Sequence, residues 1–132
     1  MKAPDTGIKR ILKAFVYSYQ GFTAVFKSEA AFRQDIAFCV FFGGLACWLN
    51  VPLLHRCFLL VALLLILLAE LTNTAIETII DRISPDYHEL SQKAKDIGSL
   101  LVLLSFINAG IIWFSVVYTD YAVLQQQISG LL

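Results

Sequence analysis

The chain has 132 residues, of which 58% are hydrophobic and only 15% are charged. Soluble domains are roughly 45–50% apolar and about 25% charged, so this composition excludes a disordered chain and a disulfide-rich secreted domain, and it argues against a soluble globule. Ten basic residues balance ten acidic ones, which leaves no net charge to attract nucleic acid. We therefore expect one all-α membrane domain over residues 1–132.

Residues 7–28 are predicted to form an amphipathic helix on the membrane surface. Apolar side chains recur there at three- and four-residue spacing, and Lys9, Arg10 and Lys13 fall between them. The segment lacks the unbroken apolar stretch of a signal peptide, so we expect it to belong to the folded protein.

Three segments have the length and apolar character of transmembrane helices, at about 30–50, 54–82 and 96–119. About 20 apolar residues cross roughly 30 Å of hydrocarbon. The second segment is longer than one crossing needs, so we expect it to tilt or to project from the bilayer. Residues 120–132 are predicted to form a polar, mobile tail.

The basic residues predict the orientation of the three spans. Nine of the ten lie at or before about residue 33 or between about 82 and 96, on one side of the three spans, and only Arg56 lies on the other side. By the positive-inside rule, the N-terminus and the connection at 82–96 face the cytoplasm. The nine are Lys2, Lys9, Arg10, Lys13, Lys27, Arg33, Arg82, Lys93 and Lys95.

The second span carries the most informative polar residues. Glu70 follows thirteen unbroken apolar residues, and Asn73 and Glu77 lie on its helical face at i+3 and i+7. A carboxylate within a span normally faces a protein interior or a water-filled site. The alternative is a helix end that emerges into water, with its carboxylates merely solvated.

Two further features indicate a site near the cytoplasmic interface. Glu29 is predicted at the same depth as Glu77, and two carboxylates suit Mg²⁺, which binds through one or two carboxylates and substrate phosphates. Glu29 could equally complement a helix dipole. Lys95 and Asp96 precede the third span, where they could hold a phosphate or form part of a solvated loop. From the residues alone, a transporter and a lipid-modifying enzyme both fit.

Five short stretches give the sequence a specific resemblance. They are EAAFRQ at 29–34, ELTNTAIE at 70–77, DR at 81–82, YHEL at 87–90 and AKDIGS at 94–99. Together they closely resemble the small bacterial integral-membrane diacylglycerol kinases, over about residues 7–118. The resemblance implies a homotrimer in the bacterial inner membrane, in which each chain gives one surface helix and three spans and neighbouring chains share active sites.

The resemblance also implies an activity and a role for each matching residue. The activity is ATP-dependent phosphorylation of diacylglycerol to phosphatidic acid, with Mg²⁺ as the cofactor. Glu70 matches the general base, Asn73 its polar partner, and Glu29 and Glu77 the metal carboxylates that hold ATP-bound Mg²⁺. The other nucleotide positions are Arg10, Tyr17, Asp86, Tyr87, His88, Lys95 and Asp96. The lipid positions are Arg10, Trp48, Arg56, Glu70, Ser99 and Trp113.

Other functions remain as alternatives. A related branch of the family phosphorylates undecaprenol with the same catalytic residues, although the EAAFRQ and CWLN stretches look closer to the diacylglycerol branch. From a different class, a small ion-coupled transporter would use Glu70 as its coupling carboxylate. A purely structural membrane subunit is the third alternative. A nucleotide site must lie outside the bilayer, so Lys95, Asp96 and Tyr17 favour the kinase.

Overall fold

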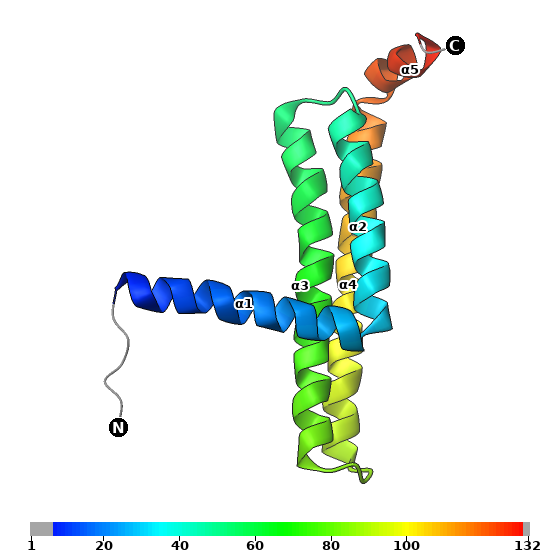
Figure 1. Ribbon diagram of the computed structural model, residues 1–132. Helices are drawn as coiled ribbons and strands as arrows, with labels where there is room; N and C mark the ends of the chain where they lie inside the picture. Colours follow the sequence, from blue (N-terminus) through cyan, green and yellow to red (C-terminus); the bar gives the residue numbers. More distant parts are fainter. Residues whose placement is uncertain (1–6, 131–132) are drawn as a thin grey trace.

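The computed structural model describes residues 7–130, and these residues form five α-helices and no strand (Figure 1). The helices are α1 (Ile8–Ser28), α2 (Ala30–Trp48), α3 (Leu53–Ile83), α4 (Glu89–Thr119) and α5 (Tyr121–Ser129). The predicted all-helical architecture is confirmed, and α2, α3 and α4 are long and apolar enough to cross a membrane. Lys2, one of the nine basic residues behind the predicted orientation, and residues 131–132 of the tail lie outside the described residues.

The three long helices form a bundle of unequal lengths. The 19 residues of α2 make a helix of about 28 Å at 1.5 Å per residue, close to the thickness of a hydrocarbon core. α3 and α4 have 31 residues each, about 46 Å, and they continue together past the level at which α1 joins the bundle (Figure 1). We call the projecting end of this pair, with the connection at 84–88, the loop end. The opposite end, with residues 49–52, is the turn end.

The third long helix starts earlier than the apolar pattern indicated. It begins at Glu89, ahead of the expected span at about 96–119, because the charged residues before a span can form helix in water. His88 caps this start: its Nδ1 accepts a hydrogen bond of 3.2 Å from the Leu90 backbone N–H. The first two turns of α4 are therefore polar.

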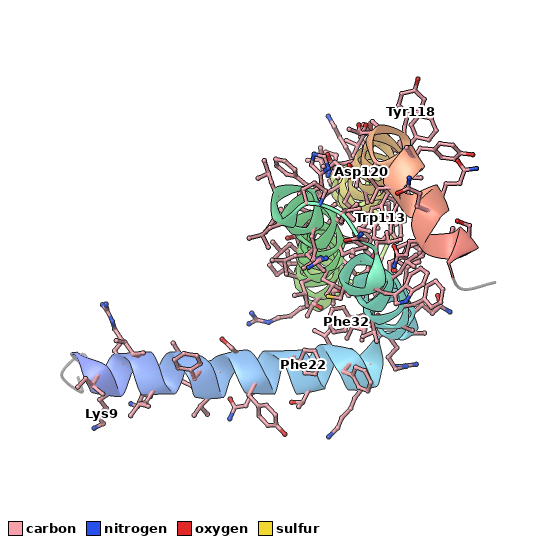
Figure 2. The ribbon with its side chains drawn as sticks, turned by 90° about the horizontal axis from the view of Figure 1, so that it is seen from above. Lys9, Phe22, Phe32, Trp113, Tyr118 and Asp120 are labelled. Atoms are coloured by element: carbon pink, nitrogen blue, oxygen red, sulfur yellow. The ribbon has the colours of Figure 1, made fainter. Side chains whose placement is uncertain are left out.

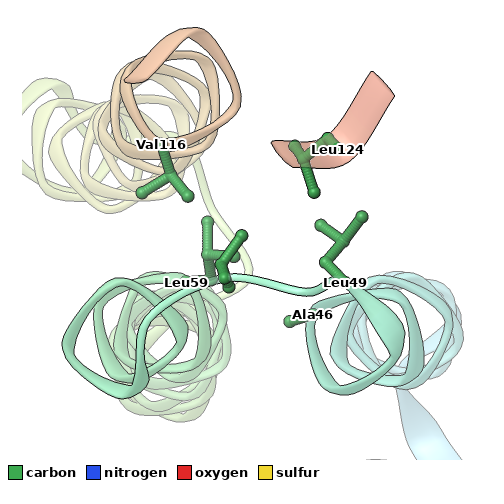
Figure 3. Packing of buried hydrophobic residues seen from close by; sticks show 6 residues of the cluster. Ala46, Leu49, Leu59, Val116 and Leu124 are labelled. Atoms are coloured by element: carbon green, nitrogen blue, oxygen red, sulfur yellow. The ribbon is translucent and has the colours of Figure 1, made fainter. Parts of the chain in front are cut away.

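The bundle core consists of two apolar clusters. One lies at the turn end, where Leu59 of α3 packs among Ala46, Leu49, Val116 and Leu124 (Figure 3). The other lies nearer the middle and contains Ala62, Leu63, Ile66 and Ala109, with Phe38, Phe42, Phe106 and Trp113 packed against it. Outside these clusters, many large apolar side chains of the long helices stay exposed, as expected for helices that meet lipid or other chains.

The corner between α1 and α2 is fixed by specific contacts. Arg33 Nη1 donates to the carbonyl oxygens of Phe26 at 3.0 Å and Lys27 at 3.3 Å, which occupies acceptors left unpaired at the end of α1. Phe22 packs edge-on against buried Phe32, with ring centroids 5.8 Å apart. As a result α1 points away from the bundle (Figure 2), and Glu29 sits at the corner itself.

The end of the chain differs from the expected mobile tail, because it forms a helix docked on the turn end. Leu124 of α5 is buried in the turn-end cluster. The Gln127 amide bridges to the turn: Oε1 accepts from the Asn50 backbone N–H at 2.9 Å, and Nε2 donates to the Trp48 carbonyl at 3.0 Å. Where α4 gives way to α5, Asp120 pairs with His55 of α3 at 2.7 Å.

These contacts predict that Gln127 holds α5 in place. Gln127→Ala removes one donor and one acceptor, worth about 1–2 kcal/mol together, so amide hydrogen exchange in 121–129 should accelerate about tenfold. Exchange measured by mass spectrometry in detergent micelles checks this. The matched control is Gln126→Ala at the exposed neighbouring position, and equal exchange in the two variants would contradict the assignment.

Candidate functional site

A polar face of α3 forms the centre of the candidate site. Glu70, Asn73 and Glu77 share this face, as their spacing predicted. Glu70 is only 6% exposed and Thr74 only 8%, so this part of α3 does not simply emerge into water. Asn73 Nδ2 donates a hydrogen bond of 3.2 Å to Glu77 Oε1, one turn further along. The helix thus places a buried carboxylate about 10 Å along its axis from a second, hydrogen-bonded one.

Carboxylates from two other positions approach this face. Asp35, Glu77 and Glu29 all lie near enough for their charges to act on Glu70. Glu29 lies at the α1–α2 corner directly before α2, and Asp35 lies in the second turn of α2, which packs against α3. The charges of both predicted metal carboxylates and of Asp35 therefore act on Glu70 within one chain.

Asp35 is a member of this cluster that the sequence analysis missed. It stands directly before the first uncharged window, where it looks like the edge of a span, although the structure places it partly buried. One feature of the sequence could have indicated Asp35. It stands six residues after Glu29, so it lies less than two helical turns from the predicted interface.

The donor atoms of this cluster fit a hard cation that arrives with phosphates. Within residues 7–130 no group of three or more His, Cys, Asp or Glu side chains is close enough to hold a metal ion unaided. The charged groups that act on Glu70 are carboxylates, and Mg²⁺ typically takes one or two carboxylates and fills its other positions with water and substrate phosphates. Such a set suits an ion that arrives bound to a nucleotide.

The loop end contains a polar cavity of about 220 Å³. Four predicted nucleotide residues line it, together with Asp81 and Ser84. Lys95 Nζ reaches across the cavity wall to Asp81 Oδ1 at 2.5 Å. Asp96 is exposed and does not line the cavity; its Oδ1 accepts a hydrogen bond of 2.8 Å from Gln92. The four lining residues are Asp86, Tyr87, His88 and Lys95.

Two predicted nucleotide residues lie elsewhere in the chain. Arg10 and Tyr17 are exposed on α1, which packs mainly against α2 and points away from the bundle. Lys9, next to Arg10, marks the far end of α1 in Figure 2. Within one chain, therefore, these two residues do not join the loop-end cavity.

Three of the six predicted lipid residues lie toward the turn end. Arg56 Nη2 donates to the Leu49 carbonyl at 3.1 Å, and Trp113 packs edge-on against Phe42 with ring centroids 5.1 Å apart. Trp48 is 50% exposed at the end of α2. The other three lie elsewhere: Arg10 is on α1, Glu70 is buried in α3, and Ser99 is exposed on α4 beside Gly98, at the level of Asn73.

Three membrane-length helices, one of which carries the buried carboxylate Glu70, define an all-helical membrane protein with an internal polar site. Comparison with known proteins identifies its class. The family model of prokaryotic diacylglycerol kinase matches residues 16–117. The chain belongs to the prokaryotic diacylglycerol kinase family, which confirms the resemblance seen in the sequence.

Individual relatives agree with this assignment. The diacylglycerol kinase of Escherichia coli K12 is 41% identical over 116 residues, which cover 88% of this chain and 95% of that protein. The diacylglycerol kinase of Pseudomonas aeruginosa is 40% identical over 112 residues, 85% of this chain and 91% of the relative. That of Helicobacter pylori J99 is 34% identical over 115 residues, with coverage of 87% and 90%. α5 lies beyond the stretch matched by the family model.

Proposed function

We propose that this protein is an ATP- and Mg²⁺-dependent lipid kinase that phosphorylates diacylglycerol to phosphatidic acid. The observation that carries the proposal is the buried Glu70 carboxylate on the same helical face as the Asn73–Glu77 pair. Membership in a family of diacylglycerol kinases supplies the reaction class. An ion-coupled transporter would use a buried carboxylate too, but it has no need of a polar cavity at a projecting loop end.

Glu70 acts in this proposal as the general base. The lipid hydroxyl oxygen attacks the γ-phosphorus of ATP, its proton passes to the Glu70 carboxylate, and the bond from that phosphorus to the β–γ bridging oxygen breaks to release ADP. A positioned base typically contributes about 10²–10⁴-fold to such a proton transfer. The depth of Glu70 supports the assignment, because a lipid hydroxyl approaches from the bilayer side.

Glu29 and Glu77 hold the nucleotide's Mg²⁺ in this proposal. When bound, the ion neutralises charge on the transferring phosphoryl group. Glu77 lies one turn from Asp81 on α3, and Asp81 lines the loop-end cavity. The polar surface is therefore continuous from Glu77 to the residues Asp86, Tyr87, His88 and Lys95. The nucleotide occupies this surface with its γ-phosphate nearest Glu77, and Asp96 and Lys95 contact it from α4.

The lipid lies along the outside of the bundle in this proposal. Its headgroup stands near Glu70 and Ser99, and its chains run toward the turn end with Trp48, Arg56 and Trp113. α1 lies in the cytoplasmic leaflet interface of the bacterial inner membrane. The absence of buried side chains in α1 supports this, since Phe15 and Tyr19 are each 71% exposed and need an apolar medium.

A homotrimer with shared sites would explain why Arg10 and Tyr17 lie far from the loop-end cavity of their own chain. Arg10 and Tyr17 stand on a helix that leaves its own bundle, so they are placed to reach a neighbouring chain's nucleotide. Two apolar grooves on the bundle, of about 390 and 380 Å³, leave room for side chains of other copies.

The first prediction from this proposal tests the base. Glu70→Gln keeps size and shape, so kcat for diacylglycerol phosphorylation should fall at least about 10²-fold while the KM for Mg²⁺-ATP stays near the parent value. Rates in mixed micelles with ³²P-labelled ATP measure this. Glu89→Gln, at the exposed start of α4, is the matched control and should retain parent kinetics. Near-parent kcat for Glu70→Gln would rule out Glu70 as the base.

The same assay tests the lipid assignment. Undecaprenol replaces diacylglycerol at equal mole fraction in the micelle. We expect a higher kcat/KM for diacylglycerol, and the reverse preference would place the chain in the undecaprenol branch. Phosphorylation of neither lipid by the parent protein would contradict the proposed kinase altogether.

The second prediction tests the metal ligands. Glu29→Gln and Glu77→Gln each remove one negative oxygen ligand, so the Mg²⁺ concentration for half-maximal rate should rise about tenfold or more. Titration of Mg²⁺ at fixed ATP measures it. An unchanged Mg²⁺ dependence in either variant would show that its carboxylate is not a ligand.

The third prediction tests shared sites. Arg10→Ala chains and Glu70→Gln chains should each be weakly active alone, but mixed trimers should regain activity because some sites combine an intact α1 with an intact α3. Refolding the two chains together from denaturant, with affinity tags to verify mixing, provides the sample. Mixed oligomers without recovery would mean that each site is built within one chain.

A further inference from the structure

Gly98 of α4 faces the Asn73 side chain across the α3–α4 interface. Gly98 is buried, and a Cβ placed on it would collide with Asn73 Oδ1 and lie 3.3 Å from Cγ. The same Cβ would lie 3.6 Å from the Asn73 Cα, which is ordinary van der Waals contact. The space that any larger residue would need at 98 is therefore taken by the side chain of Asn73 and not by the backbone of α3.

The other end of the Asn73 amide points at the proposed metal ligand. Its Nδ2 donates to Glu77 Oε1, whereas its Oδ1 is buried and has no hydrogen-bond partner within the described chain. No donor among the described residues therefore holds the oxygen end in place. What restrains it is packing against the bare Cα of Gly98.

We propose that Gly98 is a positioning residue of the kinase: by leaving room for the Asn73 amide, it sets the orientation in which Asn73 holds the Glu77 carboxylate. This inference rests on the proposed function for its catalytic readout. A methyl group at 98 displaces Oδ1, and because Oδ1 ends a rotatable side chain, the amide turns before the helices separate. That rotation carries Nδ2 away from Glu77.

The contacts around Gly98 favour rotation of the Asn73 amide over separation of α3 from α4. One turn before Gly98 on α4, Lys95 pairs with Asp81 of α3 at 2.5 Å, which ties the two helices together near the contact. A small misplacement of a group that orients reacting atoms can cost up to about 10²-fold in rate. We therefore expect Gly98→Ala to act through Asn73 on Glu77, and to appear in the Mg²⁺ dependence of the reaction.

The test is a double-mutant cycle of Gly98→Ala and Asn73→Ala in the full-length protein. Gly98→Ala alone should raise the Mg²⁺ concentration for half-maximal rate about tenfold, with a smaller effect on the KM for the lipid. In the Asn73→Ala background the amide is already gone, so adding Gly98→Ala should change neither value further. Parent kinetics in Gly98→Ala, or losses that multiply in the double variant, would overturn the proposal.

Thermal unfolding of the same variants gives a readout that does not need activity. Gly98→Ala should lower the unfolding midpoint. The double variant should unfold at a higher temperature than Gly98→Ala, because removing the Asn73 amide leaves room for the added methyl group. Gly110→Ala, on the same helix with nothing within 4 Å of its added Cβ, is the matched control; it should leave the kinetics unchanged and should not lower the midpoint.

The two readouts separate failure of this inference from failure of the proposed function. If the parent protein phosphorylated no lipid, the proposed kinase would fall, and the unfolding cycle would still decide whether Gly98 and Asn73 are coupled. If the parent were an active kinase and the unfolding effects of the two substitutions simply added, the Gly98 inference alone would fall.

Discussion

The antiparallel pairing of α3 with α4 is the contact on which the rest of the structure depends. It supports both apolar clusters, and it brings the polar start of α4 alongside the polar end of α3, where neither sequence segment could form a site alone. Because both helices are longer than a bilayer crossing, their pairing continues beyond the hydrocarbon, where charged groups can be hydrated. The candidate site lies at this transition, with Glu70 buried and Lys95 near water.

The properties that could be predicted from the sequence are those encoded within single segments. Three apolar windows predict three long helices, and an acidic residue after thirteen apolar ones predicts a buried carboxylate, as found for Glu70. The exact start of α4 at Glu89 and the helix α5 are beyond what hydropathy can indicate, because hydropathy marks where lipid begins and not where a helix does. A polar stretch such as Gln125 to Gln127 forms a helix only when distant groups pair with it.

The properties that could not be predicted are contacts between distant residues. Gln127 finds its partners 77 and 79 positions earlier in the chain, and no local pattern indicates them. Asp35 joins the carboxylate cluster because a corner after α1 sets the direction of α2. Gly98 resembles any glycine in a helix until Asn73 is placed opposite it. The resemblance to a family assigned roles to residues, but only the three-dimensional arrangement separates the nucleotide positions on α1 from those at the loop end.

The short α2 has a consequence for where in the bilayer the carboxylates stand. Its far end is anchored at the turn end, where Gln127 holds the Trp48 carbonyl, and its near end carries Asp35 and the Glu29 corner. The 19 residues of α2 therefore fix the distance between these two ends. In the proposed orientation, a bilayer thicker or thinner than the length of α2 forces the bundle to tilt or the lipid to deform locally, and either response changes the height of Glu29 relative to the lipid headgroups.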